Sequence, residues 1–178
     1  MKKPQTPFPT TGYFGPDYFC DREVELKKLI HNCHGGNSTS LITLRRIGKT
    51  ALIRHLFYHL KSRYITIYLD ILPSESLGDL LNLLSNAIAS EYSERTSTGK
   101  KIWTMIKSFR PVISYDSLSG QPQISIQASP EESKQAIGEL FSFLDIQSRP
   151  VIIAIDEFQQ ILEYPEKNTD AWLRSLVQ

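Results

Sequence analysis

The sequence predicts an α/β protein built around a parallel central sheet, because strand-like and helix-like patterns alternate along the chain. Strand patterns occur at 40–44, 64–71 and 151–155. Between and after them, apolar residues recur every three or four positions, as they do on the buried face of a helix. The run at 151–155 is continuously apolar, which is typical of a central parallel strand covered on both faces.

Local signals predict where the helices begin. Asp21 is the expected N-cap of a helix that runs to about residue 32 and stops before Gly35. Ser129 and Glu132 predict a capping box at the start of a later helix, with proline at its first position. Two helices have clear apolar faces, one after Thr50 with residues 52, 53, 56, 57 and 60, and one after Ser76 with residues 77, 80, 81, 84 and 88.

The chain is expected to hold an arm, a core and an insertion. Residues 1–18 are rich in proline and glycine, show no periodic pattern and predict an extended arm. Residues 19–178 form the core, and 93–128 interrupt it with a helix at 100–109 and a hairpin of Val112–Tyr115 with 124–126. Aromatic residues of the insertion either pack this small subdomain or form an interaction surface: Trp103, Phe109 and Tyr115.

Composition excludes several classes of protein. The 178 residues carry a net charge of +1 and are 40% apolar, which indicates one ordinary globular domain and no global electrostatic signature of nucleic-acid binding. The longest apolar run, at 151–155, is far shorter than the ~20 residues of a membrane-spanning helix. No signal sequence is visible, and two cysteines without a disulfide framework predict a reducing cytoplasm.

The first candidate site is a phosphate-binding loop between the strand pattern at 40–44 and the helix that follows it. A turn that feeds a helix N-terminus directs backbone N–H groups and the positive end of the helix dipole at an anion. Lys49 would then reach the outer phosphates of a nucleotide, and the Thr50 hydroxyl would hold Mg²⁺. The residues predicted to contact the nucleotide are Thr43, Leu44, Arg45, Arg46, Ile47, Gly48, Lys49, Thr50 and Ala51.

One position departs from the usual G-x-x-x-x-G-K-[ST] pattern. Thr43 stands where the first glycine is expected, and its Cβ denies the backbone the freedom that glycine has. Arg45 and Arg46 either add positive potential near the phosphates or pair with acidic groups. The alternative to a phosphate site is a basic helix start with Lys49 in solvent.

The second candidate site is the pair Asp156 and Glu157, which follows the apolar run at the carboxyl end of a predicted strand, where ligands of parallel sheets bind. Asp156 would coordinate Mg²⁺ through water, and Glu157 would polarise the water that attacks the γ-phosphate, with Lys49 as the second catalytic group. Asp70, at the end of the preceding strand, either faces the nucleotide or caps its strand. The alternative is a polar strand end with solvated acids, but two motifs in this order favour nucleotide binding.

Three segments resemble the prokaryotic ATPases often called archaeal-type ATPases, within the STAND and AAA+ portion of the P-loop NTPases: residues 19–26, 44–50 and 155–159. The first matches an F-x-x-R-x-x-E-L-like start through Phe19, Arg22, Glu25 and Leu26. The resemblance covers about residues 17–178. It implies a three-layer P-loop fold, ATP and Mg²⁺ as ligands, Lys49 and Thr50 as phosphate and Mg²⁺ contacts, Asp156 as the Walker B aspartate and Glu157 as catalytic base.

The resemblance also carries structural expectations. Members of this family sometimes have a small residue other than glycine at the position of Thr43, so this residue is expected to be tolerated. The family sheet normally gains two more strands after Walker B, one with a polar sensor residue, and then a helical lid and a winged helix. We therefore expect residue 178 to be a truncation point, with part of the sheet unpaired and weak ATP hydrolysis. The segment at about 100–127 resembles an insertion seen in these proteins.

The leading functional prediction is an ATP- and Mg²⁺-dependent ATPase core, hydrolytic in the full-length protein, that couples nucleotide state to a conformational or assembly change. One alternative is a regulatory or scaffold module with little turnover, which Thr43 and the missing sensor strand favour. Another is a small P-loop kinase, which the Asp156 and Glu157 pair disfavours. A protein partner or self-association is expected, and nucleic acid is suggested by family association alone.

Histidines and cysteines give weaker signals. Metal-ligand types occur at Cys20, His31, Cys33 and His34, but their spacing matches no standard zinc pattern. His55 and His59 are four residues apart without the glutamate of H-E-x-x-H, which predicts histidines at the surface or at the edge of the core.

Overall fold

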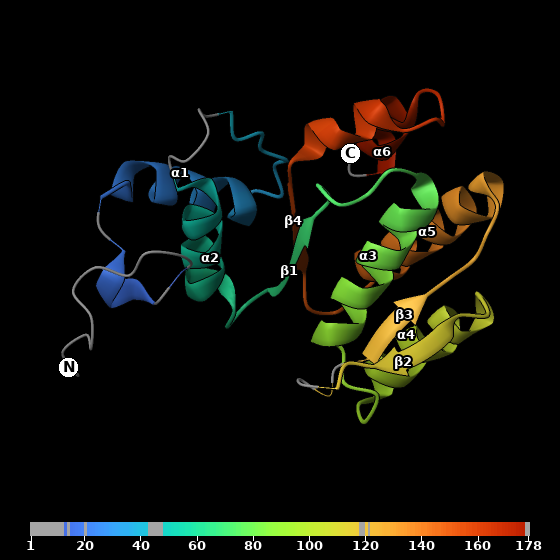
Figure 1. Cartoon of the computed structure of the whole chain (residues 1–178). Helices are drawn as coiled ribbons and strands as arrows, with labels where there is room; N and C mark the ends of the chain where they lie inside the picture. Colours follow the sequence, from blue (N-terminus) through green and yellow to red (C-terminus); the bar gives the residue numbers. More distant parts are fainter. Residues whose placement is uncertain are drawn as a thin grey trace. The chain divides into compact units, whose positions relative to one another are not determined.

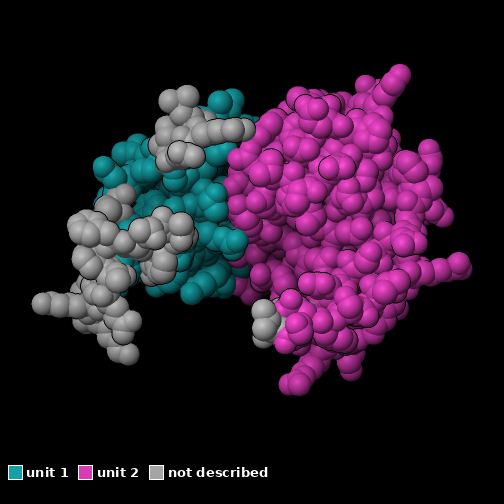
Figure 2. All heavy atoms as spheres, viewed as in Figure 1, with its two compact units in different colours: residues 1–64 teal, residues 65–178 magenta. Residues whose placement is uncertain are grey.

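The structure is a computed structural model that describes residues 13, 15–19, 21–42, 48–117, 120 and 122–176. The chain divides into two units, residues 1–64 and residues 65–178, which Figure 2 colours separately.

Unit 1 is helical in its described part. A 3₁₀ turn, η1 (Pro16–Tyr18), precedes α1 (Glu23–His34) and α2 (Lys49–Leu60), and the two α-helices pack against each other. Leu26 and Leu29 of α1 are buried. The predicted apolar face of α2 is confirmed, since all five of its members are buried: Leu52, Ile53, Leu56, Phe57 and Leu60.

Two predictions in unit 1 are wrong within the described residues. Asp21 does not cap α1, because Arg22 is the N-cap residue and both residues have a left-handed backbone, with φ of 67° and 65°. The Arg22 carbonyl accepts from the Leu26 N–H at 3.0 Å, so the helix starts one residue later than expected. Residues 40–42 form no strand, and Ile42 is 94% exposed, because an apolar run becomes a strand only where a neighbouring strand pairs with it.

The sheet of unit 2 pairs β1 (Ile65–Asp70) with β4 (Val151–Asp156) in parallel, from Ile65 opposite Val151 to Asp70 opposite Asp156. Side chains alternate between the two faces of a strand. The odd-numbered residues of both strands belong to the core or pack against it, together with α3 (Leu77–Glu91) and α5 (Pro130–Asp145). Figure 1 shows α3 and α5 side by side, and their contact is direct. One sheet face therefore builds the core.

The continuous apolar run of β4 is less covered than expected. Residues 151–155 are half-buried instead of fully buried, and among the described residues β4 pairs with β1 alone. The continuous pattern correctly predicts a parallel strand, but the prediction of full cover on both faces is wrong here, because side chains on both faces of β4 keep part of their surface exposed.

The predicted helix starts of unit 2 are confirmed. The Ser76 side chain accepts from the Asp79 N–H at the start of α3, and every member of the predicted apolar face is buried. At α5, Ser129 and Glu132 form the reciprocal capping box, with Pro130 at the first helical position. These signals are local, so the sequence alone suffices to predict them.

The segment predicted to be an insertion contains α4 (Ser97–Ser108) and an antiparallel hairpin of β2 (Val112–Tyr115) and β3 (Pro122–Ser125). The helix starts three residues before its predicted start and β3 two residues before, while β2 is placed as predicted. Two asparagines of α3, here called the asparagine clip, bind the backbone of the β3 segment. Asn86 bonds both the N–H and the C=O of Ile124 at 2.8 Å, and Asn82 bonds the N–H of Ile126 at 2.6 Å. Side-chain amides thus take the place of a further strand.

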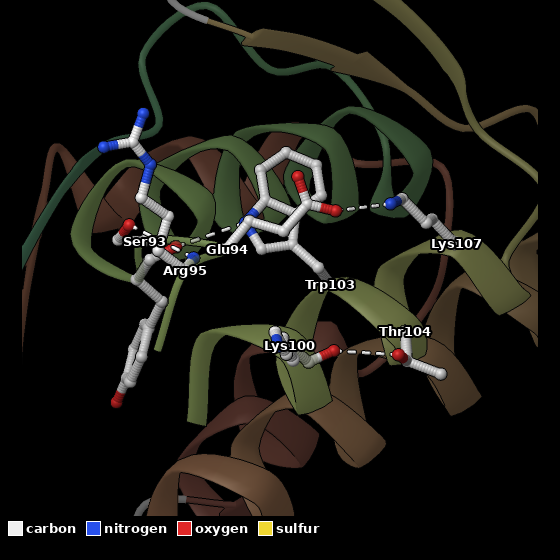
Figure 3. A network of polar contacts seen from close by, with 8 residues as sticks. Ser93, Glu94, Arg95, Lys100, Trp103, Thr104 and Lys107 are labelled. Atoms are coloured by element: carbon white, nitrogen blue, oxygen red, sulfur yellow. Dashed lines mark hydrogen bonds and ion pairs between the residues drawn. The ribbon is translucent and has the colours of Figure 1, made fainter. Parts of the chain in front are cut away.

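A tight corner joins α3 to α4 (Figure 3). The indole Nε1–H of Trp103 donates to the Tyr92 carbonyl at 3.1 Å, and Lys107 lies 2.6 Å from a Glu94 carboxylate oxygen. A Cβ added to Gly99 would lie 1.7 Å from the Ser93 carbonyl oxygen, so the corner requires glycine there. Buried Trp103 supports the prediction that this aromatic residue packs the subdomain, whereas Tyr115 is 72% exposed.

The chain continues after β4 through the 3₁₀ segment η2 (Phe158–Glu163) to α6 (Thr169–Leu176). Leu173 of this last helix is buried. Among the described residues, no helix combines the length and the apolar character that crossing a bilayer requires.

Candidate functional site

The start of α2 carries the described part of the predicted phosphate loop. Gly48 adopts a left-handed backbone, φ 72° and ψ 30°, directly before Lys49 opens the helix. No atom of the described residues lies within 4 Å of where a Cβ would be, so backbone conformation favours glycine here. The residues from Thr43 to Ile47, with Arg45 and Arg46 among them, lie outside the described residues.

The first turn of α2 has the local geometry that an anion site needs. The first intrahelical bond runs from the Leu52 N–H to the Gly48 carbonyl at 3.0 Å. The amides of Lys49, Thr50 and Ala51 precede that bond, and amides in this position point out of the helix end, where the helix dipole is positive. Lys49 is half-buried and Thr50 is exposed. This end of the helix can therefore attract a phosphate group.

The carboxyl end of β4 holds the second group of predicted residues. Asp156 is buried, with 8% of its surface exposed. The Tyr68 hydroxyl donates to its Oδ2 at 2.7 Å, and the Glu157 backbone N–H donates to its Oδ1 at 3.0 Å. These bonds come from a neighbouring strand and from the next residue, so they fix the orientation of the carboxylate.

Glu157 stands at a sharp change of chain direction. Its backbone is left-handed, φ 55° and ψ 39°, between the last residue of β4 and the first residue of η2. The Gln159 side-chain amide donates to a Glu157 carboxylate oxygen. A left-handed conformation is uncommon for a residue other than glycine and costs about 1 kcal/mol or more. The left-handed backbone therefore turns Glu157 away from the direction that an extended continuation of β4 would take.

The segment after Glu157 is fastened to the loop that follows β1. The Gln160 side-chain amide donates to the Ser74 carbonyl at 3.1 Å, and the hydroxyls of Ser74 and Tyr164 lie 2.5 Å apart. Ser74 is fully buried, and burial raises the pKa of Tyr164 above its usual value of 10.0. These contacts connect residues about 90 positions apart, so they hold η2 in a defined place after the strand.

The sheet register gathers polar groups on one face. Tyr68, Asp70 and Asp156 occupy alternate positions of the paired strands, on the face opposite the core residues. Asp70 lies opposite Asp156 in the register and accepts from the Leu72 N–H at 3.0 Å. Asp70 therefore caps its own strand, which confirms one of the two readings, and that it faces a nucleotide stays a prediction.

The structure brings the predicted residues together in two groups. Gly48, Lys49, Thr50 and Ala51 share the first turn of α2 in unit 1, and Asp156 and Glu157 share the end of β4 in unit 2. Sequence reasoning missed Tyr68 and Gln159, which hold the two carboxylates. The alternation of β1 does place Tyr68 on the face of Asp70, but only the register shows that it reaches Asp156.

Oxygen ligands of this kind suit a hard divalent cation. A threonine hydroxyl and carboxylates are the protein groups that Mg²⁺ takes beside phosphate oxygens and water. Among the described residues, no cluster of three or more histidine, cysteine or acidic side chains forms a ready-made metal cage.

Comparison with known proteins identifies the family of this chain. The model of an ATPase domain found predominantly in Archaea matches residues 19–177, which is nearly the whole chain. No curated protein and no solved structure matches significantly. The match includes the start of α1, the phosphate-loop segment and the end of β4, the three segments that carry the resemblance in the sequence. The chain belongs to the family of ATPase domains found predominantly in Archaea.

Proposed function

We propose that this chain is the core of a P-loop ATPase that binds ATP with Mg²⁺ and hydrolyses it to drive a conformational or assembly change. The observation that carries the proposal is the start of α2, where a left-handed Gly48 directly precedes Lys49 and Thr50 in the first helical turn. Membership in an ATPase family supports ATP as the nucleotide. A three-layer P-loop fold of the AAA+ and STAND type is the architecture that we infer.

Each predicted residue has a role in this proposal. Lys49 binds the outer phosphates as a positive charge, and the Thr50 hydroxyl takes a place among the Mg²⁺ ligands. Asp156 holds a water of the cation, in the manner of a Walker B aspartate. Glu157 accepts a proton from the water that attacks the γ-phosphate. Bound Mg²⁺ neutralises charge that develops on the phosphate oxygens.

A second function is favoured by one contact. The Tyr68 hydroxyl binds Oδ2 of Asp156, and a water held for a cation would compete for that oxygen. A site that retains this bond binds nucleotide without efficient turnover. The second candidate is therefore a nucleotide-binding regulatory module, and Thr43 in place of the first glycine also favours it.

Calorimetric titration with ATP and Mg²⁺ tests binding. Lys49→Ala is expected to weaken binding at least about tenfold, because a hydrogen bond to a charged group contributes about 1.5–3 kcal/mol. The matched control is Lys27→Ala, which removes an exposed lysine of the same unit and is expected to bind as the unchanged chain does. Equal affinities in both variants contradict the phosphate loop.

Single-turnover hydrolysis separates the two candidate functions. Glu157→Gln is expected to retain ATP binding and to slow hydrolysis about 100-fold or more, since a general base typically contributes about 10²–10⁴-fold. Binding without any hydrolysis by the unchanged chain supports the regulatory module. Equal hydrolysis by the unchanged chain and by Glu157→Gln contradicts the catalytic role of this glutamate.

A further inference from the structure

Two histidines of α2 form a close pair that the proposed ATPase does not use. His55 and His59 are one helical turn apart, and their Nε2 atoms are 3.3 Å from each other. The ring planes are nearly perpendicular, at 86°, with centroids 4.7 Å apart. His55 is buried, whereas His59 is exposed, so the pair extends from the interior to the surface.

The buried ring is held in place from two further directions. Phe19 stacks on His55 with centroids 4.0 Å apart and an interplanar angle of 14°. The Tyr13 hydroxyl lies 2.8 Å from Nδ1 of His55. When Nδ1 carries the proton, this hydroxyl accepts it as a hydrogen bond, and Nε2 presents its lone pair toward His59. Histidines that bind metals are commonly oriented in this way through their second ring nitrogen.

The separation of the two nitrogens matches tetrahedral coordination. Zn²⁺ binds imidazole nitrogen at about 2.0–2.1 Å, and a tetrahedral angle then places two such nitrogens about 3.3–3.4 Å apart. Ligands at the right angles of a square-planar or octahedral ion would lie closer, at about 2.8–3.0 Å. Without a metal, the same distance allows a long hydrogen bond between the two rings.

We propose that His55 and His59 form a two-histidine site for a tetrahedral divalent transition-metal ion, with Zn²⁺ as the favoured ion. Tyr13 is the positioning residue of this site. The part of the chain that the structure describes supplies no third histidine, cysteine or acidic ligand, so water or an external ligand completes the coordination. The site is independent of nucleotide binding, and the metal links two turns of the helix that begins at Lys49.

Titration of the metal-free chain with Zn²⁺, in competition with a chromophoric chelator and without nucleotide, tests the site. His59→Gln removes one ligand at an exposed position, so the fold is expected to persist, and Zn²⁺ affinity is expected to fall at least about tenfold. Tyr13→Phe retains the ring and removes the hydroxyl, and a loss of about 10-fold is expected, as for other partners of metal-binding histidines.

The matched control removes the other two histidines of the chain. The double variant His31→Gln and His34→Gln changes α1, which also carries Cys33, and is expected to bind Zn²⁺ as the unchanged chain does. Co²⁺ in place of Zn²⁺ is expected to give the strong visible absorption of tetrahedral coordination, which His59→Gln should lose. Unchanged Zn²⁺ affinity in His59→Gln, a loss confined to the α1 variant, or an octahedral Co²⁺ spectrum would each overturn the proposal.

Discussion

Removal of one asparagine of the clip should destabilise unit 2 by a predictable amount. In Asn86→Ala the N–H and the C=O of Ile124 both lose their side-chain partner, each bond being 2.8 Å long. Each lost hydrogen bond costs about 1 kcal/mol, and a buried backbone group left without a partner costs about 1–3 kcal/mol. Ile124 is buried, but Asn86 is half-buried, so water can reach part of the gap. The expected loss in the free energy of unfolding is therefore about 2–4 kcal/mol.

Urea unfolding followed by tryptophan fluorescence measures this change. Both tryptophans of the chain, Trp103 and Trp172, lie in unit 2, so the signal reports the unit that holds the clip. The midpoint should fall while the slope of free energy against urea stays the same. Ser90→Ala is the matched control, because this exposed serine of α3 bonds the nearby Ala87 carbonyl and should change stability by about 0.5 kcal/mol or less.

A second variant isolates the role of the amide group. Asn86→Asp keeps an oxygen that can accept from the Ile124 N–H but replaces the donor to the Ile124 carbonyl with an oxygen that repels it. We expect a loss at least as large as in Asn86→Ala, together with faster hydrogen exchange at the Ile124 amide than at the Ile67 amide in β1. A change below about 0.5 kcal/mol in both variants, or full protection of Ile124 in Asn86→Ala, refutes the reasoning.

Two further predictions concern helix starts and helix interiors. Gly99→Ala should destabilise unit 2 by several kcal/mol in the same urea assay, because the new Cβ would lie 1.7 Å from the Ser93 carbonyl oxygen. In the control Gly138→Ala, the new Cβ has no atom of the described residues within 4 Å, so this variant should be more stable by up to about 1 kcal/mol. Equal effects of the two substitutions would contradict the geometry of the corner. Hydrogen bonds with the backbone and side chain of Ser129 lower the pKa of Glu132 below its usual 4.5. The charged Glu132 carboxylate therefore stabilises the folded state fully above pH 4.5, and this stabilisation is lost as the pH falls through the lower pKa of the folded state. Glu132→Gln should therefore reduce the acid dependence of urea unfolding, and identical pH profiles would show that the capping box does not act through this charge.

Local patterns predicted much of the fold. The buried faces of α2 and α3, the capping box at Ser129 and the strand β1 each follow from a few neighbouring residues, and the structure confirms them. The start of α1 did not follow, because a cap depends on the backbone angles of Arg22. The strand predicted over residues 40–42 did not follow either, because a strand depends on a partner. Periodicity carries neither kind of information.

The candidate site was predicted in its residues but not in its contacts. The sequence predicts Asp156 and Glu157 as site residues because they directly follow an apolar run, and it predicts Lys49 because this residue lies in a short phosphate-loop motif. Tyr68 touches Asp156 across 88 positions of sequence, and Tyr13 reaches His55 across 42. Such pairs arise from register and packing, and a single sequence holds no signal that joins them.

The alternation of β1 and β4 has a consequence for how this domain can evolve. Odd-numbered side chains of both strands pack toward the core, whereas Tyr68, Asp70 and Asp156 occupy even-numbered positions on the other face. Substitutions at the even-numbered positions can therefore leave the core packing of the odd-numbered side chains unchanged, and substitutions at the odd-numbered positions can leave the polar groups unchanged. Stability therefore depends mainly on the odd-numbered positions of the two strands, and chemical behaviour on the even-numbered positions. Natural variation in these strands should show this alternation, with a period of two residues.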